Sequence, residues 1–139
     1  ELEFTRQYVD IQKYRFGNGV TFEFRIDPDV LTVEVPKLTI QAFVENACIH
    51  GLERVDRPGS VSICAHRDNG ATVLTVRDNG AGCEADEVLA SVRSDSARVR
   101  HIGIQNVHRR LLHHFGHRCT FDFRSTPNEG TTVEISIAD

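Results

Sequence analysis

The chain has 139 residues, enough to bury one core but too few for two domains. Sixteen Lys and Arg against twenty Asp and Glu leave a net charge of −4, which argues against a general nucleic-acid binder. No uncharged apolar run approaches the roughly 20 residues that cross a bilayer. The four cysteines form no CxxC pair, and we expect reduced thiols in a cytoplasmic protein rather than a disulfide framework or a zinc site.

The first third of the sequence predicts a helix, a strand and a second helix. Residues 1–15 mix apolar and charged side chains, which is typical of an amphipathic helix, and this helix should end before Gly17. Residues 20–26, VTFEFRI, alternate apolar and polar as a half-buried strand does. Pro36 suits a first helical position, and the following helix, LTIQAFVENACIHG, should stop at Gly51.

The tripeptide Asp-Asn-Gly occurs twice, with two different expected roles. At 68–70 it separates the apolar segments 60–67 and 71–77, and Asn-Gly there supplies the positive φ angles of a tight hairpin turn. At 78–80 it follows the second of these segments and continues into Ala-Gly rather than into a return strand. The second copy therefore marks a possible site at the end of a buried strand.

The last third predicts a polar loop, a helix and a hairpin. Residues 93–101 have the composition of a mobile loop, 103–116 read as a helix ending at Gly116, and 119–125 pairs with 131–138. Short connections require antiparallel neighbours. We therefore expect an α/β fold of two layers, a mixed and mostly antiparallel sheet with helices on one face. The other face would be solvated or covered by a neighbour.

Common catalytic motifs are missing from the sequence. It has no GxxxxGK[ST] or GxGxxG phosphate loop, and no HExxH or GxSxG. His113 and His117 are four apart, but Gly116 interrupts the helix between them, and cationic groups at a helix end offset its dipole. We prefer that interpretation to a metal site.

Four polar or glycine-rich segments remain as candidates. Gln41, Glu45, Asn46 and His50 share one helix, and the four-residue spacing of Asn46 and His50 predicts one face. In Asp78-Asn79-Gly80-Ala81-Gly82, glycines allow close approach of a flat ligand or a phosphate. Gly103 begins a helix, where N–H groups favour an anion. Gly130-Thr131-Thr132 starts the last strand.

Together, and in this order, these segments resemble a known family. EN-A-x-x-HG, DNGAG, xGIxNVxxRL and GTT are similar to the N, G1, G2 and Gly-Thr boxes of the GHKL (Bergerat) ATP-binding fold. That superfamily includes gyrase, mismatch-repair and chaperone ATPases and sensor histidine kinases. The leading YVDIQKYRFG resembles the segment before the ATP domain in LytS-type sensor kinases. The resemblance covers the chain from about Leu2 to Ile137.

The resemblance implies a role for each segment. Asp78 would accept the adenine amino group, Gly80 and Gly82 would let the base lie against the backbone, and Thr131 would join through a water. Asn46 would offer an amide oxygen to Mg²⁺. The amides of Gly103 and Ile104 would face the phosphates, and residues 83–102 would form a lid that ATP orders. His50, Arg98 and Arg100 would lie near the phosphate tail.

Two departures from the family pattern affect this interpretation. Many members have Gly two residues before Gly103, where this chain has His101. In the gyrase and chaperone branches a water-activating Glu stands four residues before the Asn, where this chain has Ala42. Glu45 is about 100° further around the helix and is expected to point elsewhere. A site without that base suits transfer to a protein nucleophile better than hydrolysis.

The resemblance therefore implies an ATP-dependent protein-histidine kinase domain using ATP and Mg²⁺. Residues 1–15 would be the tail of a helical dimerisation segment, and 16–139 the catalytic domain. The phosphoacceptor histidine would lie on a separate dimerisation domain, which is expected outside a fragment beginning at Glu1. The partners would be that dimerisation domain and a response regulator. The full-length parent protein would be a membrane-bound homodimer. Alternatives are an anti-sigma-factor serine kinase, against which Ala42 and YVDIQKYRFG argue, and a degenerate nucleotide-binding interaction module, which His101 favours.

Overall fold

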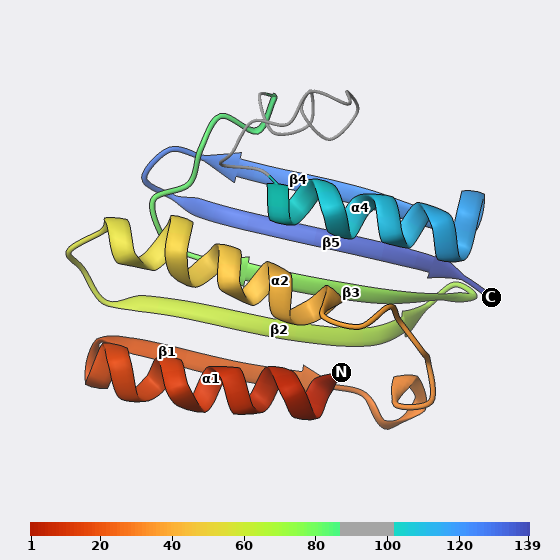
Figure 1. Ribbon diagram of the computed structural model, residues 1–139, viewed down its shortest axis with the longest axis horizontal. Coiled ribbons are helices and arrows are strands. Elements are labelled where there is room, and N and C mark those ends of the chain that lie inside the picture. The colour runs from red at the N-terminus through yellow and green to blue at the C-terminus, as the bar shows by residue number, and fades with distance from the viewer. Residues whose placement is uncertain (87–101) are drawn as a thin grey trace.

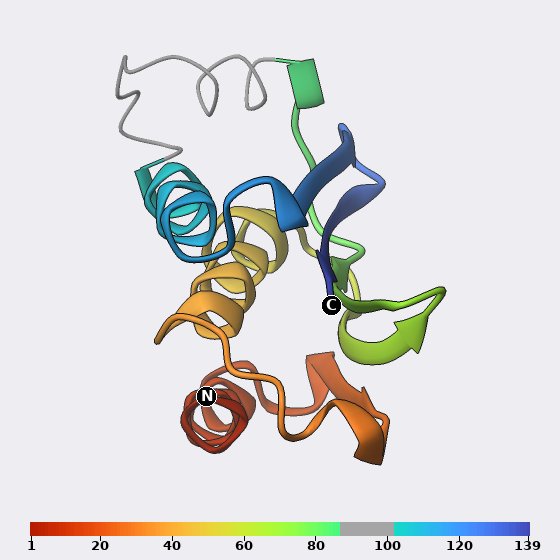
Figure 2. The same ribbon diagram turned by 90° about the vertical axis from the view of Figure 1, so that its right-hand side faces the viewer.

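The computed structural model describes residues 1–86 and 102–139, and these form two layers. The strands β1 (Val20–Ile26), β2 (Gly59–Asp68), β3 (Ala71–Asp78), β4 (Cys119–Thr126) and β5 (Gly130–Ala138) make one sheet in the order β1-β2-β3-β5-β4. The helices α1 (Leu2–Phe16), α2 (Thr39–Asn46) and α4 (Ile102–Phe115) cover one face of this sheet (Figure 1; Figure 2). The predicted two-layer fold is confirmed.

The sheet is mixed, as predicted. Only β1 and β2 run parallel, with Val20 opposite Gly59, and the three other pairings are antiparallel. β3 lies in the middle, where Asp78 at its end faces Val61 of β2 and Thr131 of β5. The hairpin between β2 and β3 turns through Asn69 and Gly70, whose φ angles of 46° and 79° are both positive. The expected Asn-Gly turn is therefore present.

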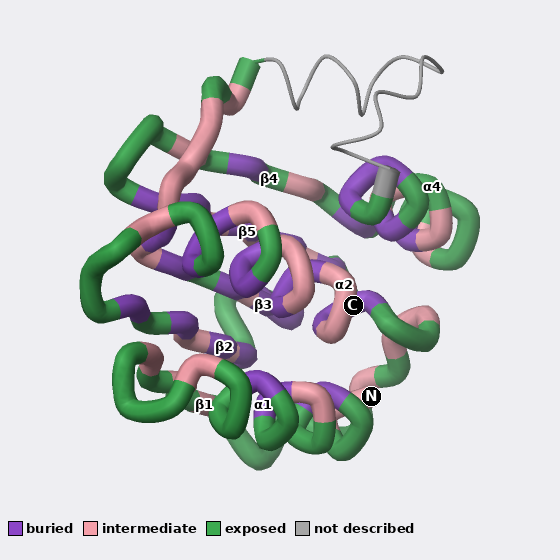
Figure 3. The backbone as a smooth tube through the Cα atoms, turned by 60° about the vertical axis from the view of Figure 1, so that its left-hand side comes forward, coloured by how far each residue is buried: buried purple, intermediate pink, exposed green. Residues whose placement is uncertain are grey.

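The core lies between the helices and the sheet (Figure 3). Val61 and Ile63 of β2 are at most 1% exposed, and Phe43, Val44 and Leu111 of the helices are equally buried. Helix α1 belongs to the same core, because Thr5 and Val9 are fully buried under it. The apolar residues that alternate along the strands thus pack against the apolar faces of the helices in one layer. This is the arrangement that binary patterning predicts.

The beginning of α2 differs from the prediction. Pro36 is not at the first helical position, since α2 begins at Thr39. The Glu1 carboxylate accepts hydrogen bonds from the backbone N–H groups of Leu38, Ile40 and Gln41, at 2.7, 2.9 and 3.2 Å. Free amides at a helix start need such an acceptor, and a negative charge there is favourable. A residue 37 or more positions away therefore helps to set where this helix starts.

The end of the same helical segment also differs. Gly51 does not stop the chain, which passes through a π turn over Ala47–Gly51 and a 3₁₀ turn over Leu52–Arg54. In the π turn the Leu52 N–H is bonded to the carbonyls of Ala47 and Cys48. This wider turn carries the chain toward the end of β3. Single π turns of this kind are frequent at functional sites.

Candidate functional site

The predicted site residues gather at one end of the molecule. That end holds the last turn of α2, the first turn of α4, the end of β3 and the start of β5, on the left in Figure 1. The C-terminus lies at the opposite end, on the right. The topology brings these segments together because α2 and β3 end, and α4 and β5 begin, on this side of the sheet.

Asp78 is a buried carboxylate at the end of β3. It is 6% exposed, its Oδ1 accepts the Gly80 N–H at 2.8 Å, and the backbone of Thr131 also donates to the carboxylate. Burial raises the pKa of Asp78 to about 6, and the two backbone hydrogen bonds lower it in part. Sequence analysis predicted a buried position for Asp78, and the structure confirms it.

This raised pKa has a consequence for the pH dependence of stability. Because the native carboxyl binds its proton more tightly than the unfolded one, its contribution to stability is full below about pH 4 and is lost as pH rises through about 6. Asp78→Asn abolishes this titration. Urea unfolding at pH 4 and pH 7 should show that the free energy of unfolding of the wild type falls by roughly 2 kcal/mol more than that of the variant. An unchanged difference between the two proteins would contradict the raised pKa.

The loop after Asp78 touches the backbone of the π turn. A Cβ on Gly80 would stand 2.5 Å from the Cα of Gly51, and one on Gly51 would stand 2.7 Å from Oδ1 of Asp78. The Ala81 N–H donates to the Gly51 carbonyl at 3.0 Å. A Cβ on Gly82 would meet the Thr126 carbonyl oxygen at 2.0 Å. Packing alone therefore accounts for both Gly80 and Gly82, and their contact with a ligand stays a prediction.

Hydroxyl groups line the same end of β4 and β5. The Oγ1 of Thr131 and the Oγ of Ser125 are 2.8 Å apart, and Ser125 Oγ also accepts the Cys83 N–H at 2.8 Å. Thr131 is 8% exposed and opposite Asp78 in the sheet. Sequence analysis missed Ser125, because a serine within an alternating strand carries no signal of its own. Thr131 thus stands beside Asp78 in the sheet, and its water-mediated contact with adenine stays a prediction.

A groove of about 610 Å³ runs between α2 and α4. Its lining includes Gln41, Ala42 and Glu45 from α2, and Gly103, Asn106, Arg109 and Arg110 from α4. Glu45 lines this groove together with Ala42 and Gly103, because residues three apart on a helix are neighbours on one face. Asn46 and Asp78 are not among the lining residues, so the expected direction of Glu45 relative to the nucleotide site stays a prediction. The groove therefore holds a carboxylate one turn beyond Ala42, and two arginines.

The first turn of α4 contributes backbone rather than side chains. Gly103 is exposed, and within residues 1–86 and 102–139 a Cβ added to it would meet nothing within 4 Å. Ile104 is 3% exposed and packs in the core, so only its backbone can face the groove. His101, Arg98, Arg100 and most of the expected lid lie outside the described residues.

Asn46 and His50 are both half-buried, but they do not share one regular helix. Asn46 is the last residue of α2, and His50 stands in the π turn that follows. Their four-residue spacing predicted one helical face, whereas a π turn changes the rotation per residue. Cys48 in the same turn is fully buried, which raises the pKa of its thiol to about 12. Cys48 is therefore a core residue rather than a nucleophile.

The family model for "Histidine kinase-, DNA gyrase B-, and HSP90-like ATPase" matches residues 33–139. This chain belongs to that ATPase family. The match includes α2, the groove and all the strands but β1. In the described part of the chain, no helix combines the length and apolar character of a membrane span.

Relatives of this ATPase domain include several sensor kinases. The chain is 32% identical to "Sensor protein LytS" of Staphylococcus haemolyticus (strain JCSC1435) over 99% of its own length and 24% of that protein. It is 34% identical to "Sensor histidine kinase YesM" of Bacillus subtilis (strain 168), over 99% of its own length and 23% of that protein. The chain thus spans about a quarter of these two relatives.

Solved structures show the same fold. The catalytic domain of histidine kinase ThkA (TM1359) matches with a TM-score of 0.68 at 16% identity, over 98% of this chain and 92% of that one. The mycobacterial sensor histidine kinase MprB matches with a TM-score of 0.65 at 17% identity, over 99% and 93% of the two chains. These likenesses place the two-layer fold among histidine kinase catalytic domains.

Proposed function

We propose that the chain is the ATP-binding catalytic domain of a LytS-type sensor histidine kinase. It would bind Mg-ATP and pass the γ-phosphoryl to a histidine of the parent's dimerisation domain, for relay to a response regulator. The observation that carries the proposal is the buried Asp78 beside Gly51 and Thr131, in a chain of the histidine kinase-like ATPase family. The identity with LytS and YesM along nearly the whole chain supports the subclass.

Within this proposal Asp78 recognises the adenine. An ionised carboxylate accepts a hydrogen bond from an exocyclic amino group, and the N–H groups of Gly80 and Thr131 hold the carboxylate in place. The amides at the start of α4 would face the phosphates, with the helix dipole favouring negative charge. Catalysis in such a site consists mainly of positioning and charge neutralisation. Glu45 lines the groove between α2 and α4, so a carboxylate lies close to Ala42. The proposal of a kinase therefore does not rest on the absence of a carboxylate from this part of the molecule.

The residues at the end of α2 fit a magnesium ion bound together with nucleotide. Asn46, half-buried at the end of α2, offers an amide oxygen, and oxygen atoms are the donors Mg²⁺ prefers. The described residues hold no group of three or more His, Cys, Asp and Glu side chains able to bind a metal. One or two protein ligands completed by phosphates and waters match this donor set. The ion would neutralise phosphate charge.

Asn46→Ala tests the metal role. The variant should weaken binding of Mg-ATP roughly tenfold or more but leave metal-free ATP in EDTA almost unaffected, because it removes a metal ligand and no base contact. Calorimetric titration in both buffers measures this. Asn18→Ala, an exposed amide in the turn Gly17–Gly19, is the control and should behave as wild type. An equal loss in EDTA and in Mg²⁺ would remove Asn46 from the metal site.

The rest of the parent protein belongs to the same proposal. Residues 1–15 would be the end of the dimerisation segment, and the parent would be a membrane-bound homodimer with this domain in the cytoplasm. An anti-sigma-factor kinase would instead place acid-stable phosphate on a serine of another protein. A degenerate module would bind no nucleotide in the titration above. The same two measurements, ATP binding and the acid lability of transferred phosphate, separate the three.

A further inference from the structure

The exposed side chain of Arg57 is hydrogen-bonded to two loops next to Asp78. It lies between the turn Leu52–Arg54 and β2, and Pro58 follows it. Its Nη2 donates hydrogen bonds to the carbonyl oxygens of Asn79 at 2.8 Å, Gly80 at 3.0 Å and Asn128 at 2.7 Å. Two of these belong to the loop after Asp78, and the third to the turn between β4 and β5. This nitrogen has two protons for three acceptors, so one N–H is shared.

The residues that follow Arg57, Pro58 and Ser60, are hydrogen-bonded to Asn79 of the same loop. The side-chain Oδ1 of Asn79 accepts the Ser60 N–H at 2.8 Å, and its Nδ2 donates to the Pro58 carbonyl at 3.4 Å. The Asn79 N–H donates to the Ser60 carbonyl at 3.3 Å. A proline at 58 also restricts the backbone conformations open to Arg57. The backbone segment that carries Arg57 is therefore held against the loop by hydrogen bonds of its own.

The turn on the other side completes the arrangement. The Asn128 N–H donates to the Ala81 carbonyl at 2.6 Å, while the Asn128 carbonyl accepts from Arg57. The loop from Asp78 to Ala81 thus lies between Gly51, the β4–β5 turn and the Arg57 guanidinium. The contacts of Gly80 and Ala81 with Gly51 are made by backbone atoms. Arg57 supplies the charged donor of this assembly, and charge-assisted hydrogen bonds are the stronger kind.

We infer that Arg57 is a positioning residue of the nucleotide site, which holds the Asp78–Ala81 loop in the shape that presents the Asp78 carboxylate to the base. This inference rests on the proposed function, because it needs adenine to bind at Asp78. Arg57 acts through backbone carbonyls and contacts no phosphate. Fixing the loop before the ligand arrives removes an ordering cost from binding. The cationic side chain therefore serves the base end of the nucleotide, and its contribution is independent of phosphate number.

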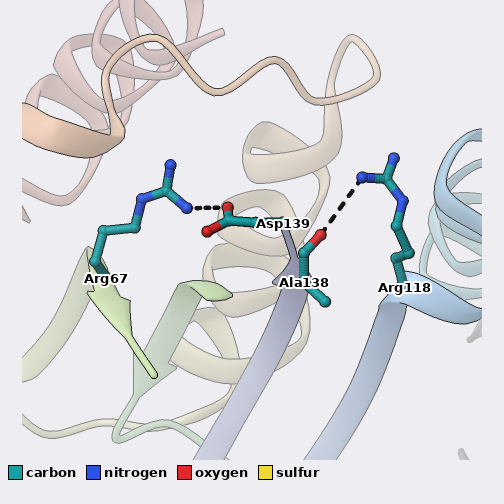
Figure 4. Close-up of polar contacts among 4 residues, drawn as sticks. All are labelled: Arg67, Arg118, Ala138 and Asp139. Atoms are coloured by element: carbon teal, nitrogen blue, oxygen red, sulfur yellow. Dashed lines mark hydrogen bonds and ion pairs between the residues drawn. The ribbon is translucent and has the colours of Figure 1, made fainter. Parts of the chain in front are cut away.

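The chain offers a matched control at the far end of the sheet. Arg118 donates to the carbonyl of Ala138 at 3.5 Å, and Arg67 nearby forms an ion pair with Asp139 (Figure 4). Arg118 is likewise an exposed arginine bonded to a backbone carbonyl, but Ala138 pairs with Ala71, at the other end of β3 from Asp78. Arg118→Ala removes the same charge without touching the site.

The test compares Arg57→Ala, Arg57→Lys and Arg118→Ala in the 139-residue chain. Arg57→Ala should weaken adenosine, ADP and ATP by the same factor, roughly tenfold, all measured without metal. Hydrogen exchange of the Gly80 and Asn128 amides should accelerate, since both are bonded within the loop. Arg57→Lys keeps the charge and three donor protons on a shorter side chain and should recover part of both losses. Arg118→Ala should change neither.

Specific outcomes would overturn the inference. A loss that grows from adenosine to ATP would mean that Arg57 contacts phosphate. Unchanged exchange at Gly80 and Asn128, or faster exchange with unchanged adenosine affinity, would also refute it. Asp78→Asn, measured in parallel, separates the two proposals: if it abolishes adenosine binding while Arg57→Ala does not weaken it, only this inference fails. If neither variant loses affinity, the adenine site is elsewhere. Should Arg57→Ala not fold, by circular dichroism, Arg57→Lys gives the same comparison.

Discussion

Asp78→Asn is expected to weaken adenine binding by about 2–4 kcal/mol, roughly 30- to 1,000-fold in affinity. Asparagine keeps the volume but replaces one acceptor oxygen with an N–H₂ group. Two backbone N–H groups already point at the carboxylate, from Gly80 and Thr131, so the amide must leave a donor facing either one of them or the base. Calorimetric titration with adenosine and with ATP should show the same loss. Wild-type affinity in the variant would exclude Asp78 from the adenine site.

Adenosine offers a second check on the same residue, because it has no phosphate that titrates near neutral pH. Protonated Asp78 loses acceptor capacity toward the base. Since burial raises the Asp78 pKa to about 6, adenosine affinity of the wild type should fall as pH decreases from 7.5 through about 6. The Asp78→Asn variant should lack this dependence. A flat profile in wild type would indicate that the ionised carboxylate does not take part in binding.

Local patterns predicted the framework of this site correctly. The Asn-Gly turn between two apolar segments identified β2 and β3, and the position after a buried strand distinguished the second Asp-Asn-Gly from the hairpin turn at 68–70. These features depend on neighbours within a few residues. The Asp78 environment followed from them, because a carboxylate ending a central strand has β2 on one side and β5 on the other.

Contacts between distant segments were beyond such patterns. Glu1 bonds amides of residues 38, 40 and 41, and Arg57 bonds carbonyls 22, 23 and 71 positions away. Gly51 read as a helix stop, but in the structure its backbone packs against Gly80 and the Asp78 carboxylate. The groove that Glu45 shares with Gln41, Ala42 and residues of α4 was likewise not predicted, because it forms only where the two helices pack together. Tertiary packing decides each of these positions.

Phosphoryl transfer by the 139-residue chain alone is expected to be undetectable, although it should bind Mg-ATP. Transfer requires the nucleophile in line and within about 3–3.5 Å of the reacting atom. His113, His114 and His117 lie at the far end of α4 from Gly103, and a helix of 14 residues is about 20 Å long. His66 lies in β2 opposite Val73, away from Asp78. The ring of His108 is 5.2 Å from that of Phe121, in edge-to-face contact.

His50 is the described histidine closest along the chain to Asn46, so it provides the sharpest test. Incubation with γ-labelled ATP, followed by acid treatment, should leave the wild type and His50→Gln equally unlabelled. Under the proposed function, a longer form of the protein that includes the proposed phosphoacceptor region should acquire acid-labile label. The relatives are about four times as long as the stretch aligned here, which leaves room for that region. Stoichiometric acid-labile label on the 139 residues, lost in His50→Gln, would make His50 the acceptor and overturn the proposed division of labour between two domains.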